Sequence, residues 1–117
     1  MLDKKVDWIK VAESEAEISW QPNHLSIITA GSKTITLAKH QDQLFACAHK
    51  CPHAGGIMAN GSIDALGNVV CPLHRYKFSL HNGRNTSGEG YYLKTYPVKV
   101  EAEGVFVGIP ATSFFNF

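Results

Sequence analysis

The sequence predicts an all-β fold, built as a small antiparallel β-sandwich or barrel. Apolar and polar residues alternate with a period of two along most segments, as in VDWIKV at residues 6–11, and such alternation indicates a half-buried strand. Each segment is short and ends at Gly, Asn or Pro, which are typical of turns. The chain has no repeats, low-complexity runs or linkers, and its 117 residues suffice for one domain.

The first part of the chain is expected to contain one strand followed by a single helical turn. The strand covers residues 6–11, where the alternation is clear. Ser14 and Glu17 then match a capping box, in which the Ser hydroxyl accepts a hydrogen bond from a backbone N–H and the Glu side chain reaches back. Only one turn is expected, because Pro22 and Asn23 interrupt the pattern soon afterwards.

Turns divide the rest of the chain into short strands. These strands are expected, in chain order, over 25–29, 34–38, 43–48, 62–64, 68–71, 77–81, 96–101 and 105–109. The segments that flank Gly31, Gly67 and Gly104 are expected to pair as hairpins. Residues 87–90 (SGEG) form a Gly-rich loop without the strand and helix context of a phosphate site.

Composition narrows the classes of partner. The formal net charge is +1, which gives no reason to expect nucleic acid or an acidic membrane surface. Hydrophobic residues make up 44% of the chain and charged residues 18%, as is ordinary for a globular protein. No apolar run reaches the length of a membrane span, and we expect no signal peptide at the N-terminus.

The chain contains three cysteines, an odd number that argues against a disulfide framework. Metal ligation in a reducing compartment is the better interpretation, and it predicts a cytoplasmic protein. Cys47 lies in the expected strand 43–48, where a free cysteine acts as a small buried apolar residue.

Two short segments combine the other two cysteines with histidines. Cys51 and His53 form a C-x-H motif, and Cys71 and His74 form a C-x-x-H motif, with 17 residues (54–70) between them. Thiolate and imidazole donors suit a [2Fe–2S] cluster in which two histidines replace two cysteines on one iron. Tetrahedral zinc is the chemical alternative. Zinc fingers usually keep like ligands together, whereas each half here is mixed.

The residues around these motifs strengthen the iron–sulfur interpretation. The first motif continues as AGG (54–56) and the second as RYKF (75–78), and the chain here resembles the Rieske family, in particular its small soluble ferredoxins. The resemblance implies a single Rieske domain over residues 1–117, with an inserted cluster-binding subdomain at about 49–79. It implies one Rieske [2Fe–2S] cluster per chain. Cys51 and Cys71 would hold the inner iron, and His53 and His74 the outer iron.

The resemblance also predicts a low reduction potential. High-potential members carry an extra cysteine in each ligand loop, joined as a disulfide, and Gly56 and Leu73 stand at those positions here. They also carry Ser and Tyr hydroxyls that donate hydrogen bonds to cluster sulfurs, at the positions of Tyr76 and Phe78. Fewer donors leave the reduced cluster less stabilised, so the potential should lie toward the bottom of the Rieske range.

The function implied is electron transfer rather than catalysis. A ferredoxin of this kind carries one electron from a ferredoxin reductase to a terminal oxygenase, and we expect both partners to dock near His53 and His74. We expect a monomer or weak oligomer. The rival interpretation is the small subunit of an assimilatory nitrite reductase, which is similar in size and fold.

The remaining conspicuous residues are assigned ordinary roles. His49, two residues before Cys51, is expected to be a surface or capping histidine rather than a ligand. Trp8 and Trp20 are expected in the core. The apolar tail 113–117 (SFFNF) is expected to pack back over the sheet, with self-association as the alternative.

Overall fold

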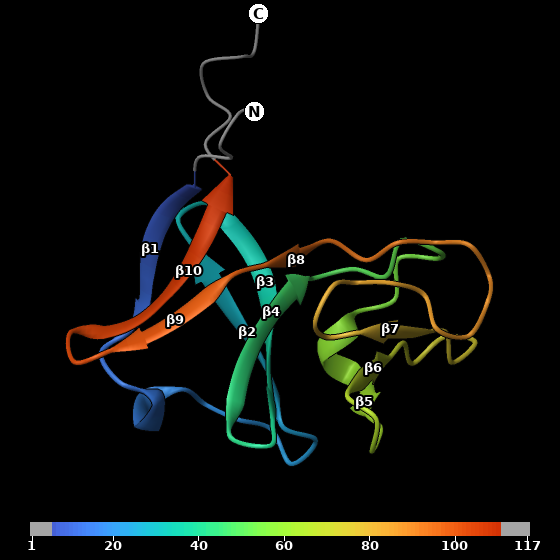
Figure 1. Cartoon of the computed structure of the whole chain (residues 1–117), viewed down its shortest axis with the longest axis horizontal. Helices are drawn as coiled ribbons and strands as arrows, with labels where there is room; N and C mark the ends of the chain where they lie inside the picture. The colour runs from blue at the N-terminus through green and yellow to red at the C-terminus, as the bar shows by residue number, and fades with distance from the viewer. Residues whose placement is uncertain (1–5, 111–117) are drawn as a thin grey trace, which may run out of the picture.

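The computed structural model describes residues 6–110 and contains three antiparallel sheets (Figure 1). The predicted all-β antiparallel architecture is therefore confirmed. The sheets have the strand orders β1-β10-β9, β2-β3-β4-β8 and β5-β6-β7. The strands are β1 (Val6–Ala12), β2 (Leu25–Ala30), β3 (Lys33–His40), β4 (Gln43–Ala48), β5 (Ser62–Ile63), β6 (Asn68–Val70), β7 (Lys77–Ser79), β8 (Thr95–Tyr96), β9 (Val98–Glu101) and β10 (Gly104–Pro110).

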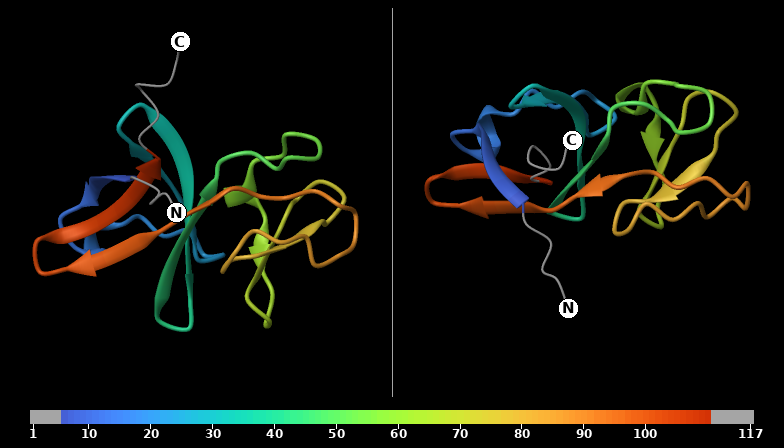
Figure 2. Two further views of the ribbon diagram at one scale, coloured as in Figure 1. Left: turned by 45° about the horizontal axis from the view of Figure 1, so that its top comes forward. Right: turned by 90° about the horizontal axis from the view of Figure 1, so that it is seen from above.

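The first two sheets form a sandwich, and the third sheet lies beside it (Figures 1 and 2). The sandwich core is made of apolar side chains from β2, β3, β4 and β10, including Ile35, Leu37 and Val105. A second core lies between the sandwich and the small sheet, and it includes Leu25, Met58 and Phe78. The excursion of the chain between β4 and β8 contains the predicted cluster-binding segment 49–79, together with residues 80–94.

The expected strand 96–101 is wrong in one respect, because it is divided at Pro97. Tyr96 in β8 pairs with Ala46 of β4, whereas Val98 in β9 pairs with Val107 of β10. Proline has no N–H to donate to a ladder, so a strand cannot continue regular pairing through it. The division places the two halves in different sheets and joins one sandwich layer to the other.

The expected helical turn is present, but it is not capped as predicted. It is the 3₁₀ turn η1 (Glu15–Glu17), and Ser14 makes no side-chain capping bond. The backbone N–H of Glu17, which the Ser hydroxyl would have accepted from, donates instead to the Ser14 carbonyl at 3.1 Å. Glu15 forms an ion pair with Lys39 at 2.7 Å, which ties the turn to β3.

Two amide side chains fasten the excursion to the sandwich. The second 3₁₀ turn, η2 (Met58–Asn60), follows the first cysteine motif along the chain. Gln21 Nε2 donates to the Ala59 carbonyl at 2.7 Å, and Asn23 Nδ2 donates to the carbonyls of Ala59 and Gly61 at 2.9 Å each. These bonds satisfy the carbonyls of Ala59 in η2 and of Gly61 directly after it, and they fix the position of η2 against the segment before β2.

The hairpin β5–β6 connects the two cysteine motifs, and Asp64 closes its turn. Asp64 Oδ1 accepts hydrogen bonds from the backbone N–H groups of Leu66 and Asn68, at 3.0 and 2.9 Å. Burial opposes ionisation of this carboxyl, but the bonds from Asn68 and Leu66 and the nearby Lys77 outweigh it, so the pKa of Asp64 is lowered. The ionised carboxylate therefore stabilises the turn.

We expect Asp64→Ala to lower the free energy of unfolding by about 1–2 kcal/mol at neutral pH, because charged hydrogen bonds are lost. A group with a lowered pKa in the folded state stabilises above its unfolded pKa of about 3.9. Its contribution is lost as the pH falls below that value. Urea titrations by far-UV circular dichroism at pH 7 and pH 3 measure this, and the exposed Asp7→Ala is the control. A wild-type advantage that is equally large at pH 3 would contradict the assignment.

Candidate metal centre

The two cysteine motifs occupy the tips of two hairpins with matching construction. The first tip lies between Lys50 and Ile57, which form an antiparallel bridge. The second lies between Val70 and Lys77, which pair in the β6–β7 ladder. Each hairpin therefore presents six residues, 51–56 and 71–76, beyond its last paired residues.

The same backbone bond closes each tip. The Cys51 N–H donates to the Gly56 carbonyl at 2.7 Å, and the Cys71 N–H donates to the Tyr76 carbonyl at 2.8 Å. In both cases the acceptor lies five residues after the cysteine. The first tip has a second internal bond, from the Gly55 N–H to the Cys51 carbonyl at 3.0 Å. Both cysteines are thus held at equivalent places at the base of a closed loop.

Each tip contains left-handed backbone, but only the first uses glycine for it. Gly55 has a φ of +74°. In the second tip His74 and Arg75 have φ values of +60° and +59°. This region costs residues with a Cβ roughly 1–2 kcal/mol each, so the second tip holds backbone strain at a candidate ligand. Backbone strain of this kind is often found at active sites and ligand-binding sites, where the surrounding structure holds the strained conformation in place.

The thiols of Cys51 and Cys71 lie together in the interior. Cys51 is 2% exposed and Cys71 is fully buried. Burial and the neighbouring Cys51 raise the pKa of the Cys71 thiol to about 11, against a hydrogen bond from the Leu73 N–H that lowers it. An adjacent metal cation would stabilise both thiolates in this interior position.

The two imidazoles form a second pair, which comes from the same two hairpin tips as the thiols. Nδ1 of His53 and Nδ1 of His74 are 3.4 Å apart, and the ring centroids are 5.0 Å apart. His74 is exposed and His53 is half-buried. Tyr76 stacks on His53 with a centroid distance of 4.2 Å and an interplanar angle of 25°. The His53 ring is therefore supported by the ring of Tyr76, while the His74 ring is exposed to solvent.

The donor set fits a [2Fe–2S] group better than a single metal ion. Each iron of a Rieske cluster takes two protein ligands, two thiolates on one iron and two imidazoles on the other. The thiols and the imidazoles are arranged in these two pairs. Within residues 6–110, no three of the His, Cys, Asp and Glu side chains converge on one metal position. Tetrahedral zinc needs four donors around one point.

Gly56 lies close to the thiol pair. A Cβ at this position would be 3.1 Å from Cys71 Sγ and 3.0 Å from Leu73 Cγ. Positions 56 and 73 are therefore neighbours, as a disulfide between them would require, but Gly and Leu provide none. The close approach of the Gly56 backbone to the sulfur depends on its missing side chain.

Two other candidate side chains, Cys47 and His49, are not part of the two hairpin tips. Cys47 is fully buried in β4, and burial raises the pKa of its thiol to about 12. Its predicted role as a buried apolar residue is confirmed. His49 is half-buried, and its Nδ1 has no hydrogen-bond partner among the described residues. The tail 113–117 lies outside the described residues.

The sequence analysis missed one side chain at the site, Tyr91. Its ring centroid lies 5.2 Å from that of His53 and 5.7 Å from that of Tyr76. The available signal was the adjacent pair Tyr91-Tyr92, which directly follows the Gly-rich loop 87–90. Both tyrosines are exposed, and aromatic pairs exposed on a surface are a sign of an interaction site.

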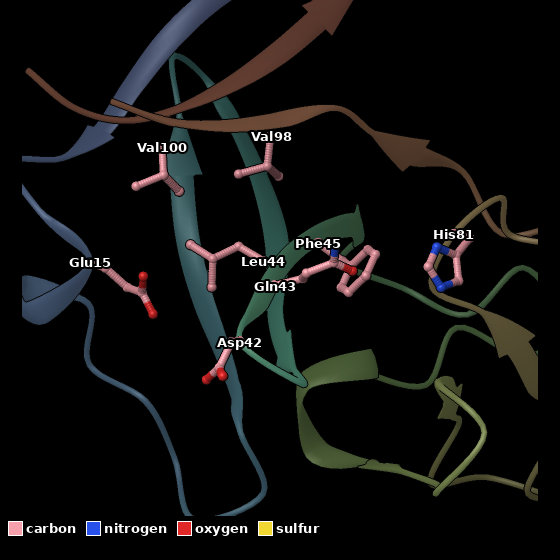
Figure 3. Close-up of a pocket in the computed structure, with 8 residues that line it drawn as sticks. All are labelled: Glu15, Asp42, Gln43, Leu44, Phe45, His81, Val98 and Val100. Carbon is pink, nitrogen blue, oxygen red and sulfur yellow. The ribbon is translucent and has the colours of Figure 1, made fainter. Parts of the chain in front are cut away.

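An open groove of about 510 Å³ lies elsewhere on the molecule (Figure 3). Glu15 and Asp42 lie on one side of it, Val98 and Val100 on another, and His81 at its end. None of the four candidate cluster ligands lines this groove.

Over residues 6–110, no helix is long and apolar enough to cross a membrane.

Residues 7–97 match the Rieske [2Fe-2S] domain family. The match spans most of the chain, and the chain therefore belongs to this family. Its members hold a Rieske-type [2Fe–2S] cluster, so the cofactor expected from the two motifs is supported by the family as well as by the donor geometry.

The curated relatives are ferredoxins of oxygenase systems. The chain is 26% identical over 84 residues to the ferredoxin component of an alkene monooxygenase system from Xanthobacter autotrophicus, covering 72% of this chain and 69% of that protein. It is 31% identical over 80 residues to the ferredoxin subunit of 3-phenylpropionate/cinnamic acid dioxygenase from Escherichia coli K12, covering 68% and 76%. These relatives are electron-carrying components rather than the catalytic ones.

Solved structures share the fold. A ferredoxin in complex with the oxygenase of carbazole 1,9a-dioxygenase has a TM-score of 0.72 and 23% identity, covering 86% of this chain and 92% of that chain. A putative NADH-dependent nitrite reductase small subunit from Mycobacterium tuberculosis has a TM-score of 0.76 and 20% identity, covering 91% and 97%. At these identities the likeness concerns the fold alone.

Proposed function

We propose that this chain is a Rieske-type ferredoxin, which takes one electron from a ferredoxin reductase and passes it to a terminal oxygenase. The observation that carries the proposal is the presence of two pairs in the two hairpin tips: two imidazoles next to each other and two buried thiols next to each other. The names of the two curated relatives described above, both ferredoxins of oxygenase systems, support the role of electron carrier. The two thiols and the two imidazoles would hold the cluster, and the imidazole side of the cluster would face the solvent.

Cys51 and Cys71 would bind the inner iron, and His53 and His74 would bind the outer iron through Nδ1. The two Nδ1 atoms already face each other, which is the arrangement needed for two ligands on one metal. When bound, the cluster takes up and releases one electron. The buried thiol side excludes water, while the exposed His74 ring gives the shortest route for an electron to a partner.

The proposed docking surface surrounds the two imidazoles and consists of His53, Ala54, Gly55, Leu73 and His74. Leu73 is 43% exposed, and Ala54 and Gly55 are also exposed. A small surface with one apolar residue suits the transient interfaces of redox proteins. Reductase and oxygenase would use it in turn, and the carrier itself would be a monomer or weak oligomer.

The potential of the cluster is expected to be low, because the described loops lack the groups that raise it. Gly56 and Leu73 are neighbours without a disulfide. Phe78 is fully buried and has no hydroxyl, and the ring of Tyr76 stacks on His53. Fewer hydrogen bonds to the sulfurs stabilise the reduced cluster less.

Redox titration of the purified protein tests this proposal. Rieske centres span about −150 to +300 mV, and we expect a midpoint below zero in this range. The visible absorption and the electron paramagnetic resonance signal of the reduced cluster follow the titration. A midpoint well above zero would argue against the low-potential carrier. A protein without a reducible cluster would argue against the proposed function itself.

A second candidate is favoured by the likeness to the nitrite reductase small subunit. In that case the chain would remain bound to a catalytic subunit rather than diffuse between partners. Isolation of the tagged protein from its native cells distinguishes the two. A stable stoichiometric complex with a nitrite reductase supports the second candidate. A free protein that sustains oxygenase turnover with a reductase and NADH supports the first.

We further propose that residues 1–117 act as one Rieske domain with its cluster-binding part at 49–79. We also propose a cytoplasmic location, which the chemistry of the cysteines supports. All three are free thiols in this structure, and two of them are assigned to iron. Thiolate ligands of this kind are maintained in a reducing compartment.

A further inference from the structure

The Gly-rich segment is a fixed loop, held against β7 by hydrogen bonds. The Lys77 N–H donates to Ser87 Oγ at 2.9 Å, and the Lys77 carbonyl accepts from the Thr86 N–H at 2.9 Å and from Asn85 Nδ2 at 3.0 Å. The Gly90 N–H closes the loop on Asn85 Oδ1 at 2.7 Å. We refer to residues 85–90 as the clasp loop.

The clasp loop holds one carboxylate, that of Glu89. Its Oε1 accepts hydrogen bonds from the Ser87 hydroxyl and from Asn85 Nδ2, the latter at 3.0 Å. These two donors are themselves bonded to the backbone of Lys77. The Ser87 and Asn85 bonds lower the pKa of Glu89, so the carboxylate is ionised at neutral pH. A negative charge is therefore held in one place on the surface.

That place lies close in the chain to Tyr76 and Tyr91, two aromatic neighbours of His53. The clasp loop is fixed to Lys77, which directly follows the Tyr76 that stacks on His53. On its other side the loop leads to Tyr91, whose ring centroid is 5.2 Å from that of His53. Two aromatic neighbours of His53 thus flank the segment that carries the charge.

We propose that Glu89 is a positioning residue that sets the negative charge beside His53 and thereby lowers the reduction potential of the cluster. The inference rests on the proposed function. Reduction adds one negative charge to the cluster, and a nearby carboxylate repels it. Because Glu89 is exposed, salt should weaken the effect.

A charge series at position 89 tests the proposal by redox titration at low ionic strength. We expect Glu89→Gln to raise the equilibrium constant for reduction about threefold, and Glu89→Lys to raise it about ninefold, because each step makes the charge at this position more positive by one unit. A tenfold change corresponds to 59 mV for a one-electron couple. Glu89→Asp keeps the charge and should restore a near wild-type midpoint. High salt should reduce all of these differences.

Glu103→Gln is the matched control. Glu103 is an exposed carboxylate in the turn between β9 and β10, at the far end of the molecule from β5–β7 (Figure 1). The Glu103→Gln substitution removes the same charge as Glu89→Gln, and it should leave the midpoint potential of the cluster unchanged. Equal shifts for Glu89→Gln and Glu103→Gln would overturn the proposal, because net charge alone would explain them.

Two further outcomes would also overturn it. One is a wild-type midpoint in Glu89→Gln at low ionic strength with an unchanged cluster spectrum. The other is loss of the cluster in Glu89→Gln, which would make the clasp loop a purely structural element. Failure of the proposed function itself has a different signature, since the wild-type protein would then show no reducible Rieske spectrum.

Discussion

Cys71→Ala is expected to abolish cluster binding. The purified variant should lack the visible absorption of the cluster, its electron paramagnetic resonance signal after reduction, and bound iron. Cys71 is fully buried beside Cys51, so no water-accessible side chain can replace its thiolate on the inner iron. Alanine leaves only a small cavity, and the loss should therefore come from the missing ligand rather than from unfolding.

Cys47→Ala is the control for this experiment. It makes the same substitution at another fully buried cysteine, in β4, and Cys47 belongs to the same apolar core as Cys51 and Cys71. We expect it to retain the full iron content and an unchanged spectrum. The ligand assignment would fail if Cys71→Ala kept its cluster, or if both variants lost it to the same extent.

Gly61→Ala is expected to cost about 3 kcal/mol of folding free energy, at the upper end of the usual range for overpacking. A Cβ at Gly61 would lie 1.9 Å from the Val70 carbonyl oxygen, which is backbone and cannot rotate away. Val70 immediately precedes Cys71. The clash should therefore displace the second ligand loop, and both stability and cluster content should fall. Urea unfolding and iron analysis measure the two effects.

Gly31→Ala separates this steric effect from the general cost of replacing glycine. Gly31 lies in the turn between β2 and β3 with a φ of +65°, and a Cβ there would meet nothing within 4 Å. We expect a loss of about 1 kcal/mol from backbone strain alone, and no change in cluster content. If Gly61→Ala and Gly31→Ala lost similar amounts of folding free energy, the steric clash with the Val70 carbonyl would not be the cause.

The two candidate ligand motifs could be recognised from sequence because their signal is local. Each motif supplies one thiolate and one imidazole within four residues, and the hairpin around Gly67 brings the motifs together. Cys47 was separated from them for the same reason, since its neighbours in 43–48 alternate as a strand. The assignment of the four ligands remains a prediction, and Cys71→Ala tests it for one of them.

Other features depend on distant parts of the chain and were missed. Trp8 was expected in the core but is 40% exposed, with Lys99 Nζ 4.4 Å from the ring centroid. Trp20, in contrast, packs against the sandwich core as expected. The approach of Tyr91 to His53 depends on the return of the chain after β7, which no local pattern indicates. Only the path between β7 and β8 brings these rings together.

The closed ligand loops have a consequence for the rate of electron exchange. Each loop is locked at its base by a cysteine N–H bond, and the turn η2 is bonded to Gln21 and Asn23 of the sandwich. A frame fixed in this way has little freedom to rearrange when the charge at its tip changes. The protein part of the reorganisation energy should then be small. Transfer would be governed by donor–acceptor distance and driving force.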